Sequence, residues 1–121
     1  MSQRQHIFKA FANAFKGIAQ FFLHERNGKI QLLVAVAVIV CGYYFTISAT
    51  EWIIVLLCIG AVISAEMMNS ALEKLCDLVH KEYHPTIKII KDLAAAAVLW
   101  LAIISVIIGI IIFLPKLIAL I

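Results

Sequence analysis

Apolar and polar positions alternate at helical spacing through the first thirty residues. The apolar positions recur at steps of three and four, at Phe8, Phe11, Phe15, Ile18 and Phe22. The polar positions of the opposite side are Lys9, Asn13, Lys16 and Gln20. A helix with one aromatic side and one basic side typically lies in the surface of a membrane. We therefore predict an amphipathic surface helix within residues 1–29, and packing of this helix on a soluble partner is the alternative.

Three apolar runs follow the surface helix, and each is long enough to cross a bilayer. The first, residues 30–48, would cover about 28 Å as a helix. The second, residues 51–81, begins apolar and ends in a charged stretch, so we expect it to continue beyond the membrane. The third covers residues 89–115. The pattern predicts an all-α membrane protein with three transmembrane helices in a single domain, residues 1–121.

Short polar signals separate the three spans. The link from Ser48 to Glu51 is so short that the first two spans must form an antiparallel hairpin. Trp52 then offers an interfacial anchor for the second span. His84-Pro85 breaks the helical pattern after the charged stretch, and Pro115-Lys116 marks the far interface of the third span.

Composition agrees with a membrane protein and excludes several classes. Of 121 residues, 64% are hydrophobic and only 14% are charged, and the mean hydropathy is +1.06. A soluble domain of this length could not bury so much apolar surface. A formal charge of +3 is too small and too scattered to indicate nucleic-acid binding. The three cysteines show neither disulfide nor metal-ligand spacing.

The basic residues predict the orientation in the membrane. Most of them precede the first span or lie between the second and third: Arg4, Lys9, Lys16, Arg26, Lys29, Lys74, Lys81, Lys88 and Lys91. The positive-inside rule then places the N-terminus in the cytoplasm. Every acidic residue except Glu51 lies at or beyond the cytoplasmic membrane face, so we expect any chemistry to face the cytoplasm.

Three carboxylates and one amide share a face of the second helix. At 100° per residue, Glu66, Asn69, Glu73 and Asp77 fall within less than about a third of the circumference. Glu66 would lie inside the hydrocarbon edge, where an ionisable group is costly and normally functional. Glu73 and Asp77 would lie further out, where the alternative is an ordinary solvated face. We call these four residues the polar stripe.

Stacked acids repel one another unless a cation lies among them, and a divalent metal is the simplest such cation. Oxygen ligands without His or Cys in register favour Mg²⁺, which commonly takes its other ligands from water and phosphates. This points to a nucleotide. Lys91 could contact a phosphate and Asp92 an amino group, although lysine at a cytoplasmic helix end is also routine. Glu25 could add a carboxylate, and the chain contains no glycine-rich phosphate loop.

Specific motifs carry a resemblance to a known family. They are Glu66-Met-Met-Asn69-Ser70-Ala-Leu-Glu73-Lys-Leu-Cys-Asp77, then Glu82-Tyr83-His84, and then Lys91-Asp92-Leu-Ala-Ala-Ala-Ala-Val. Together they resemble the small bacterial integral-membrane diacylglycerol kinase and undecaprenol kinase family. The resemblance extends from Lys9 to about Leu114 and includes Lys16-Gly17 and Glu25. It implies a homotrimer in the bacterial cytoplasmic membrane that uses ATP and Mg²⁺ to phosphorylate a lipid alcohol.

The resemblance also implies roles for individual residues. Glu66 matches the general base beside the lipid hydroxyl, and Asn69 matches an amide that organises the site. Glu25 and Glu73 match the carboxylates that hold the Mg²⁺ of the nucleotide. The matches to nucleotide-contacting positions are Glu82, Tyr83, His84, Lys91 and Asp92. Two positions depart from the family pattern, His6 where some members have a phosphate-contacting arginine and Asn13 where a tyrosine occurs; Arg4 could substitute for that arginine.

The choice of lipid depends on finer features. The features that look more like the undecaprenol kinase branch are Glu25-Arg26-Asn27, Gln31, Glu51-Trp52 and the segment from Gly109 to Lys116. We therefore expect undecaprenol as the substrate, with diacylglycerol, which would yield phosphatidic acid, as the alternative. A small proton-coupled transporter and a membrane adaptor are alternatives from other classes, since a lone intramembrane Glu66 could relay protons.

Overall fold

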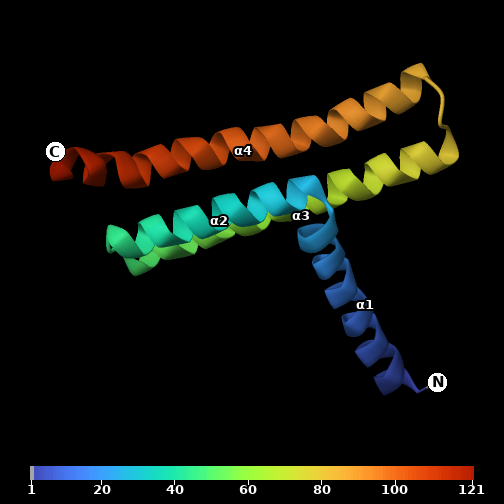
Figure 1. Cartoon of the computed structure of the whole chain (residues 1–121), viewed down its shortest axis with the longest axis horizontal. Coiled ribbons are helices and arrows are strands. Elements are labelled where there is room, and N and C mark those ends of the chain that lie inside the picture. The colour runs from blue at the N-terminus through green and yellow to red at the C-terminus, as the bar shows by residue number, and fades with distance from the viewer. Residues whose placement is uncertain (1) are drawn as a thin grey trace. The chain divides into compact units, whose positions relative to one another are not determined.

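The computed structural model describes residues 2–121, which form four helices and no strand. The helices are α1 (Gln3–His24), α2 (Arg26–Tyr44), α3 (Ala49–Val79) and α4 (Pro85–Leu120) (Figure 1). The last three are long and apolar enough to cross a membrane. The prediction of an all-α membrane protein with three spans after an N-terminal helix is therefore confirmed. The chain divides into two compact units, the first ending at Val34 and the second running from Ala35 to Ile121.

The first unit contains α1 and the start of α2. Ser2 caps α1 in a capping box, since its hydroxyl accepts from the Gln5 N–H at 3.2 Å while the Gln5 side chain accepts from the Ser2 N–H at 2.9 Å. Phe8, Phe11 and Phe15 of the predicted apolar side are exposed, and Phe22 near the end of α1 is half-buried. Exposure of this side leaves it available to a membrane surface.

The break between α1 and α2 comes earlier than the sequence pattern suggested. Glu25 is extended, with φ −103° and ψ 136°, and α2 begins at the next residue. The last turn of α1 lies close to the first turn of α2 at Gly28. A Cβ at this position would overlap the carbonyl oxygen of Phe21, so only glycine allows the close approach. The predicted boundary at residues 29 and 30 therefore falls within α2.

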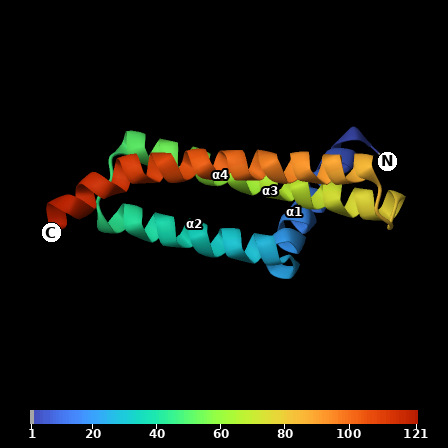
Figure 2. The same cartoon turned by 90° about the horizontal axis from the view of Figure 1, so that it is seen from above.

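In the second unit, α3 and α4 lie side by side along most of their length (Figures 1 and 2). Their buried side chains include Val55, Val62 and Cys76 of α3 and Val98 and Ile112 of α4. The helices are 31 and 36 residues long. α4 continues through Pro115 to Leu120. Proline removes one backbone donor and crowds the carbonyl four residues before it, a disturbance that membrane helices accommodate by local adjustment.

The turn between α2 and α3 closes the hairpin with a Schellman motif. The Ile47 N–H donates to the Gly42 carbonyl at 3.2 Å, and the Thr46 N–H donates to the Tyr43 carbonyl at 3.3 Å. This motif needs a left-handed residue, and Thr46 takes that conformation with φ 48°. Ile47 is buried against Val55 and Ile112. The turn therefore directs an apolar side chain into the core of the second unit.

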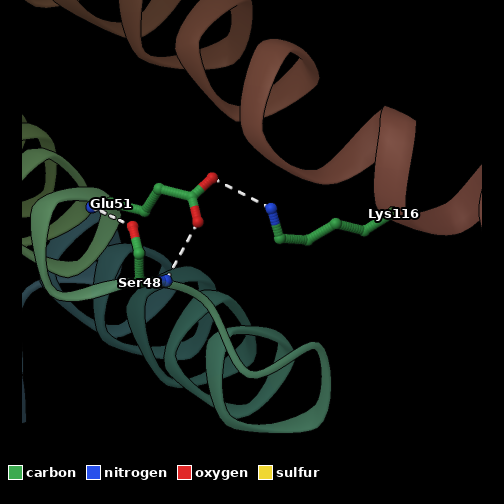
Figure 3. A network of polar contacts seen from close by, with 3 residues as sticks. All are labelled: Ser48, Glu51 and Lys116. Atoms are coloured by element: carbon green, nitrogen blue, oxygen red, sulfur yellow. Dashed lines mark hydrogen bonds and ion pairs between the residues drawn. The ribbon is translucent and has the colours of Figure 1, made fainter.

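Ser48 and Glu51 start α3 with a second capping box, which also reaches α4. The Ser48 hydroxyl accepts from the Glu51 N–H at 3.1 Å, and Glu51 Oε1 accepts from the Ser48 N–H at 2.9 Å. Glu51 Oε2 accepts from Lys116 Nζ of α4 at 2.9 Å (Figure 3). One carboxylate therefore caps α3 and joins its start to the end of α4.

The left-handed threonine generates the first testable prediction. We expect Thr46→Gly to raise the free energy of unfolding by about 1 kcal/mol, because glycine adopts φ > 0 without the clash that a Cβ causes. Thr46→Ala keeps a Cβ and is the matched control, which should show no comparable gain. Reversible unfolding of the protein in mixed micelles measures both variants. A gain in the alanine variant equal to that in the glycine variant would refute the explanation.

Candidate active site

The polar stripe lies on the C-terminal half of α3, and its exposure changes along the helix. Glu66 is half-buried, Asn69 is only 6% exposed, and Glu73 and Asp77 are exposed. Asn69 Nδ2 donates to Glu73 Oε1 at 3.3 Å. This i to i+4 contact confirms that Asn69 and Glu73 share a face of the helix.

The Asn69 amide has an unused acceptor. Its Oδ1 atom is buried and has no hydrogen-bond partner within the part of the chain that the structure describes. Ser70 beside it is also buried. A buried amide oxygen without a partner is costly for stability, so its presence calls for an explanation. The stripe therefore offers one free hydrogen-bond acceptor next to the Glu73 carboxylate.

Lysines of α4 pair with two of the acids. Lys91 Nζ donates to Asp77 Oδ1 of α3 at 2.6 Å. Lys88 Nζ donates to Asp92 Oδ2 at 2.6 Å within α4. Lys91 therefore supplies a positive charge at the Asp77 end of the polar stripe, where it offsets part of the repulsion among the stacked acids.

The connection between α3 and α4 carries three of the predicted nucleotide-contacting residues. Glu82 and Tyr83 are exposed in this connection. His84 caps α4, because its Nδ1 accepts from the Thr86 N–H at 3.1 Å, and Pro85 takes the first helical position. The His80 and His84 rings meet edge to face, with centroids 5.5 Å apart. This connection places His84 seven residues, about two turns, before Lys91.

The predicted metal ligands belong to different units of the chain. Glu25 lies at the break between α1 and α2 in the first unit, and Glu73 lies on α3 in the second. Within residues 2–121, no group of three or more His, Cys, Asp or Glu side chains gathers to hold a metal ion. The donors that are present still fit Mg²⁺, because one or two carboxylates suffice when phosphates and waters complete the octahedron.

An apolar groove lies elsewhere in the second unit. It has a volume of about 540 Å³ and is lined by α2, by Phe45 directly after α2, and by α4. Its lining residues are Ala37, Val38, Cys41, Phe45, Val106, Gly109, Ile110, Phe113, Leu114 and Leu117. None of these residues belongs to the polar stripe or to the α3–α4 connection, so the groove is separate from the candidate site.

Sequence reasoning missed the pairing of Asp77 with Lys91 and of Glu51 with Lys116. The Ser48-x-x-Glu51 spacing of a capping box could have been read from the sequence. The partners on α4 could not, because both pairs depend on which faces of two separate helices meet.

The fold and the site define an all-helical membrane protein with a carboxylate and amide stripe beside a lysine. Residues 12–113 match the model of the prokaryotic diacylglycerol kinase family. The chain belongs to this family, and the prediction of a lipid kinase is confirmed.

Curated relatives agree with this assignment. The undecaprenol kinase of Bacillus subtilis is 42% identical over 96% of this chain and 94% of its own length. The diacylglycerol kinase of Synechocystis sp. is 36% identical over 95% of this chain and 66% of its own length. The diacylglycerol kinase of Escherichia coli is 27% identical over 84% and 83%, respectively.

The unpaired Asn69 oxygen generates the second prediction. We expect Asn69→Leu to change the free energy of unfolding by no more than about 1 kcal/mol, because the gain from removing a buried acceptor without a partner offsets the loss of the hydrogen bond to Glu73. Phosphate transfer should nevertheless fall, since stability and activity oppose each other at such a site. Unfolding in mixed micelles and a kinase assay on the same preparation test both effects. A large loss of stability would show that the Asn69 side chain is a structural group.

Proposed function

We propose that the protein transfers the γ-phosphate of ATP to the primary hydroxyl of undecaprenol, with Mg²⁺ bound to the nucleotide. The contact that supports the chemistry is the Asn69–Glu73 pair, on the same helix as the half-buried Glu66. The choice of lipid is supported by the 42% identity to an undecaprenol kinase along nearly the whole of both chains.

Glu66 and Asn69 form the catalytic part of this proposal. Phosphoryl transfer requires an in-line approach, neutralisation of the phosphate charge, and a group that takes the proton of the attacking hydroxyl. Glu66 accepts that proton at the lipid hydroxyl. Asn69 lies one turn further along α3 and orients Glu73 through its amide N–H.

The remaining predicted residues bind the nucleotide. Glu73, with Glu25 as the second predicted carboxylate, holds the Mg²⁺, which neutralises phosphate charge when bound. The groups that contact the nucleotide are Glu82, Tyr83, His84, Lys91 and Asp92. This assignment is supported by the position of these residues along the α3–α4 connection and the first turns of α4.

Orientation and assembly are part of the same proposal. We place the N-terminus, the polar stripe and the nucleotide on the cytoplasmic side of the bacterial membrane, because the basic residues gather at that end. We propose a homotrimer, which the family resemblance implies.

Diacylglycerol remains the second candidate substrate. The family description and two of the relatives described above carry that name. Both lipids present a primary hydroxyl at the interface, so the same residues would serve either. Membership of a kinase family does not favour the transporter and adaptor alternatives.

The third prediction tests the lipid and the base together. Wild-type protein in bilayers receives Mg-ATP with equal amounts of undecaprenol and diacylglycerol, and both phosphorylated products are measured. We expect undecaprenyl phosphate to dominate. We expect Glu66→Gln to reduce transfer by about 100-fold or more, because the group that takes the hydroxyl proton is lost.

Glu51→Gln is the matched control for this variant. It makes the same chemical change on the same helix, and glutamine can preserve the capping box. Its transfer rate should stay near that of the wild type. Preference for diacylglycerol would overturn the choice of lipid, and equal losses in both variants would overturn the role of Glu66.

The fourth prediction concerns the metal. Chelation of divalent cations should abolish transfer, and added Mg²⁺ should restore it. We expect Glu73→Gln to raise the Mg²⁺ concentration needed for half-maximal transfer, because one hard oxygen ligand loses its charge. A titration of transfer rate against free Mg²⁺ measures the shift. An unchanged Mg²⁺ requirement would remove Glu73 from the metal site.

A further inference from the structure

The Lys91 ammonium is held against α3 by a residue that the predicted nucleotide site does not include. Its Nζ atom lies 2.6 Å from Asp77 Oδ1, and this contact joins the end of α3 to the second turn of α4. Lys91 therefore lies at the exposed end of the polar stripe.

A lysine side chain held in this way is already ordered for binding a phosphate group. The ammonium has three donors, so a single contact with Asp77 leaves two for phosphate oxygens. A free lysine side chain loses much rotamer freedom when a ligand orders it, and that loss weakens binding. A carboxylate that orders the side chain beforehand removes part of this cost. The Lys91 charge meanwhile offsets the negative charge of Asp77.

The exposure of the pair argues against a mainly structural role. The side chains of Lys91 and Asp77 are 38% and 65% exposed, and ion pairs so open to water contribute little to stability. The other α3–α4 pair, Lys116 with Glu51, is more enclosed, at 29% and 25%. The two pairs join the same two helices at opposite ends, so the Glu51 pair is an internal reference for a purely structural contact.

We propose that Asp77 is a positioning residue for nucleotide binding, which orders the Lys91 ammonium so that two of its N–H groups face the phosphates of Mg-ATP. The inference rests on the proposed function, because it assigns Lys91 to the nucleotide. Asp77 itself contacts neither the nucleotide nor the lipid in this role. Its effect passes entirely through Lys91.

The test is a double-mutant cycle with the full-length protein in lipid bilayers. Equilibrium dialysis gives the Kd of Mg-ATP, and steady-state assays with undecaprenol and with diacylglycerol give kcat and the KM for ATP. We expect Asp77→Asn to raise both the Kd and the KM for ATP between about threefold and tenfold, with little change in kcat. Asp77→Glu should recover part of the loss, because it restores a charged acceptor.

The Lys91→Met background separates positioning from a structural effect. Without the ammonium, Asp77 only repels phosphate, so adding Asp77→Asn to Lys91→Met should leave the Kd unchanged or lower it. A structural role would instead add a further loss. Glu51→Gln removes the charge of the matched α3–α4 pair and should leave the Kd and the KM for ATP at wild-type values.

Several results would overturn the inference. One is a Kd for Mg-ATP in Asp77→Asn that is unchanged or lower than in the wild type. Another is a double variant in which the losses of Mg-ATP affinity from Asp77→Asn and Lys91→Met add. A third is a raised Mg²⁺ requirement of Asp77→Asn at unchanged Kd, which would make Asp77 a metal ligand. A wild type that binds no Mg-ATP would overturn it together with the nucleotide site. A wild type that binds Mg-ATP but phosphorylates neither lipid would overturn the proposed function alone, because the binding cycle still reports on Asp77.

Discussion

The antiparallel packing of α3 on α4 is the constraint on which the second unit depends. Two carboxylate and lysine pairs mark its register, Glu51 with Lys116 at one end and Asp77 with Lys91 at the other. The paired residues are spaced almost equally, by 26 positions on α3 and 25 on α4, or about 39 and 38 Å. A slip by one helical turn would therefore break both pairs at once.

This register places the polar stripe and Lys91 at one end of the helix pair and the α2–α3 turn at the other. At the Glu51 end, the Schellman turn around Thr46 and the capping box of Ser48 bury Ile47 in the core. At the Asp77 end, the chain turns through a short connection, His84 caps the start of α4, and Lys91 of α4 contacts Asp77 of the polar stripe. The polar stripe and Lys91 thus come from two helices that are joined by a connection of only five residues, 80–84.

Apolar burial within the chain is sparse, which changes what specifies the fold. No large side chain of residues 2–121 is fully buried, and most of the leucine and isoleucine side chains are exposed. In a bilayer this exposure costs nothing, because lipid tails solvate apolar side chains, but it also removes the usual driving force for helix association. Caps, close contacts at glycine and a few polar pairs then carry much of the specificity.

The sequence by itself determined the number and type of elements, because long apolar runs in a membrane protein have few alternatives to spanning helices. Helical periodicity likewise predicted that Asn69 and Glu73 share a face, as their hydrogen bond shows. Only the tertiary structure decided that Lys91 pairs with Asp77 and that Lys116 pairs with Glu51. It also decided that the Asn69 side-chain oxygen is buried without a hydrogen-bond partner among residues 2–121. Periodicity describes the faces of one helix, whereas these contacts depend on the register between two.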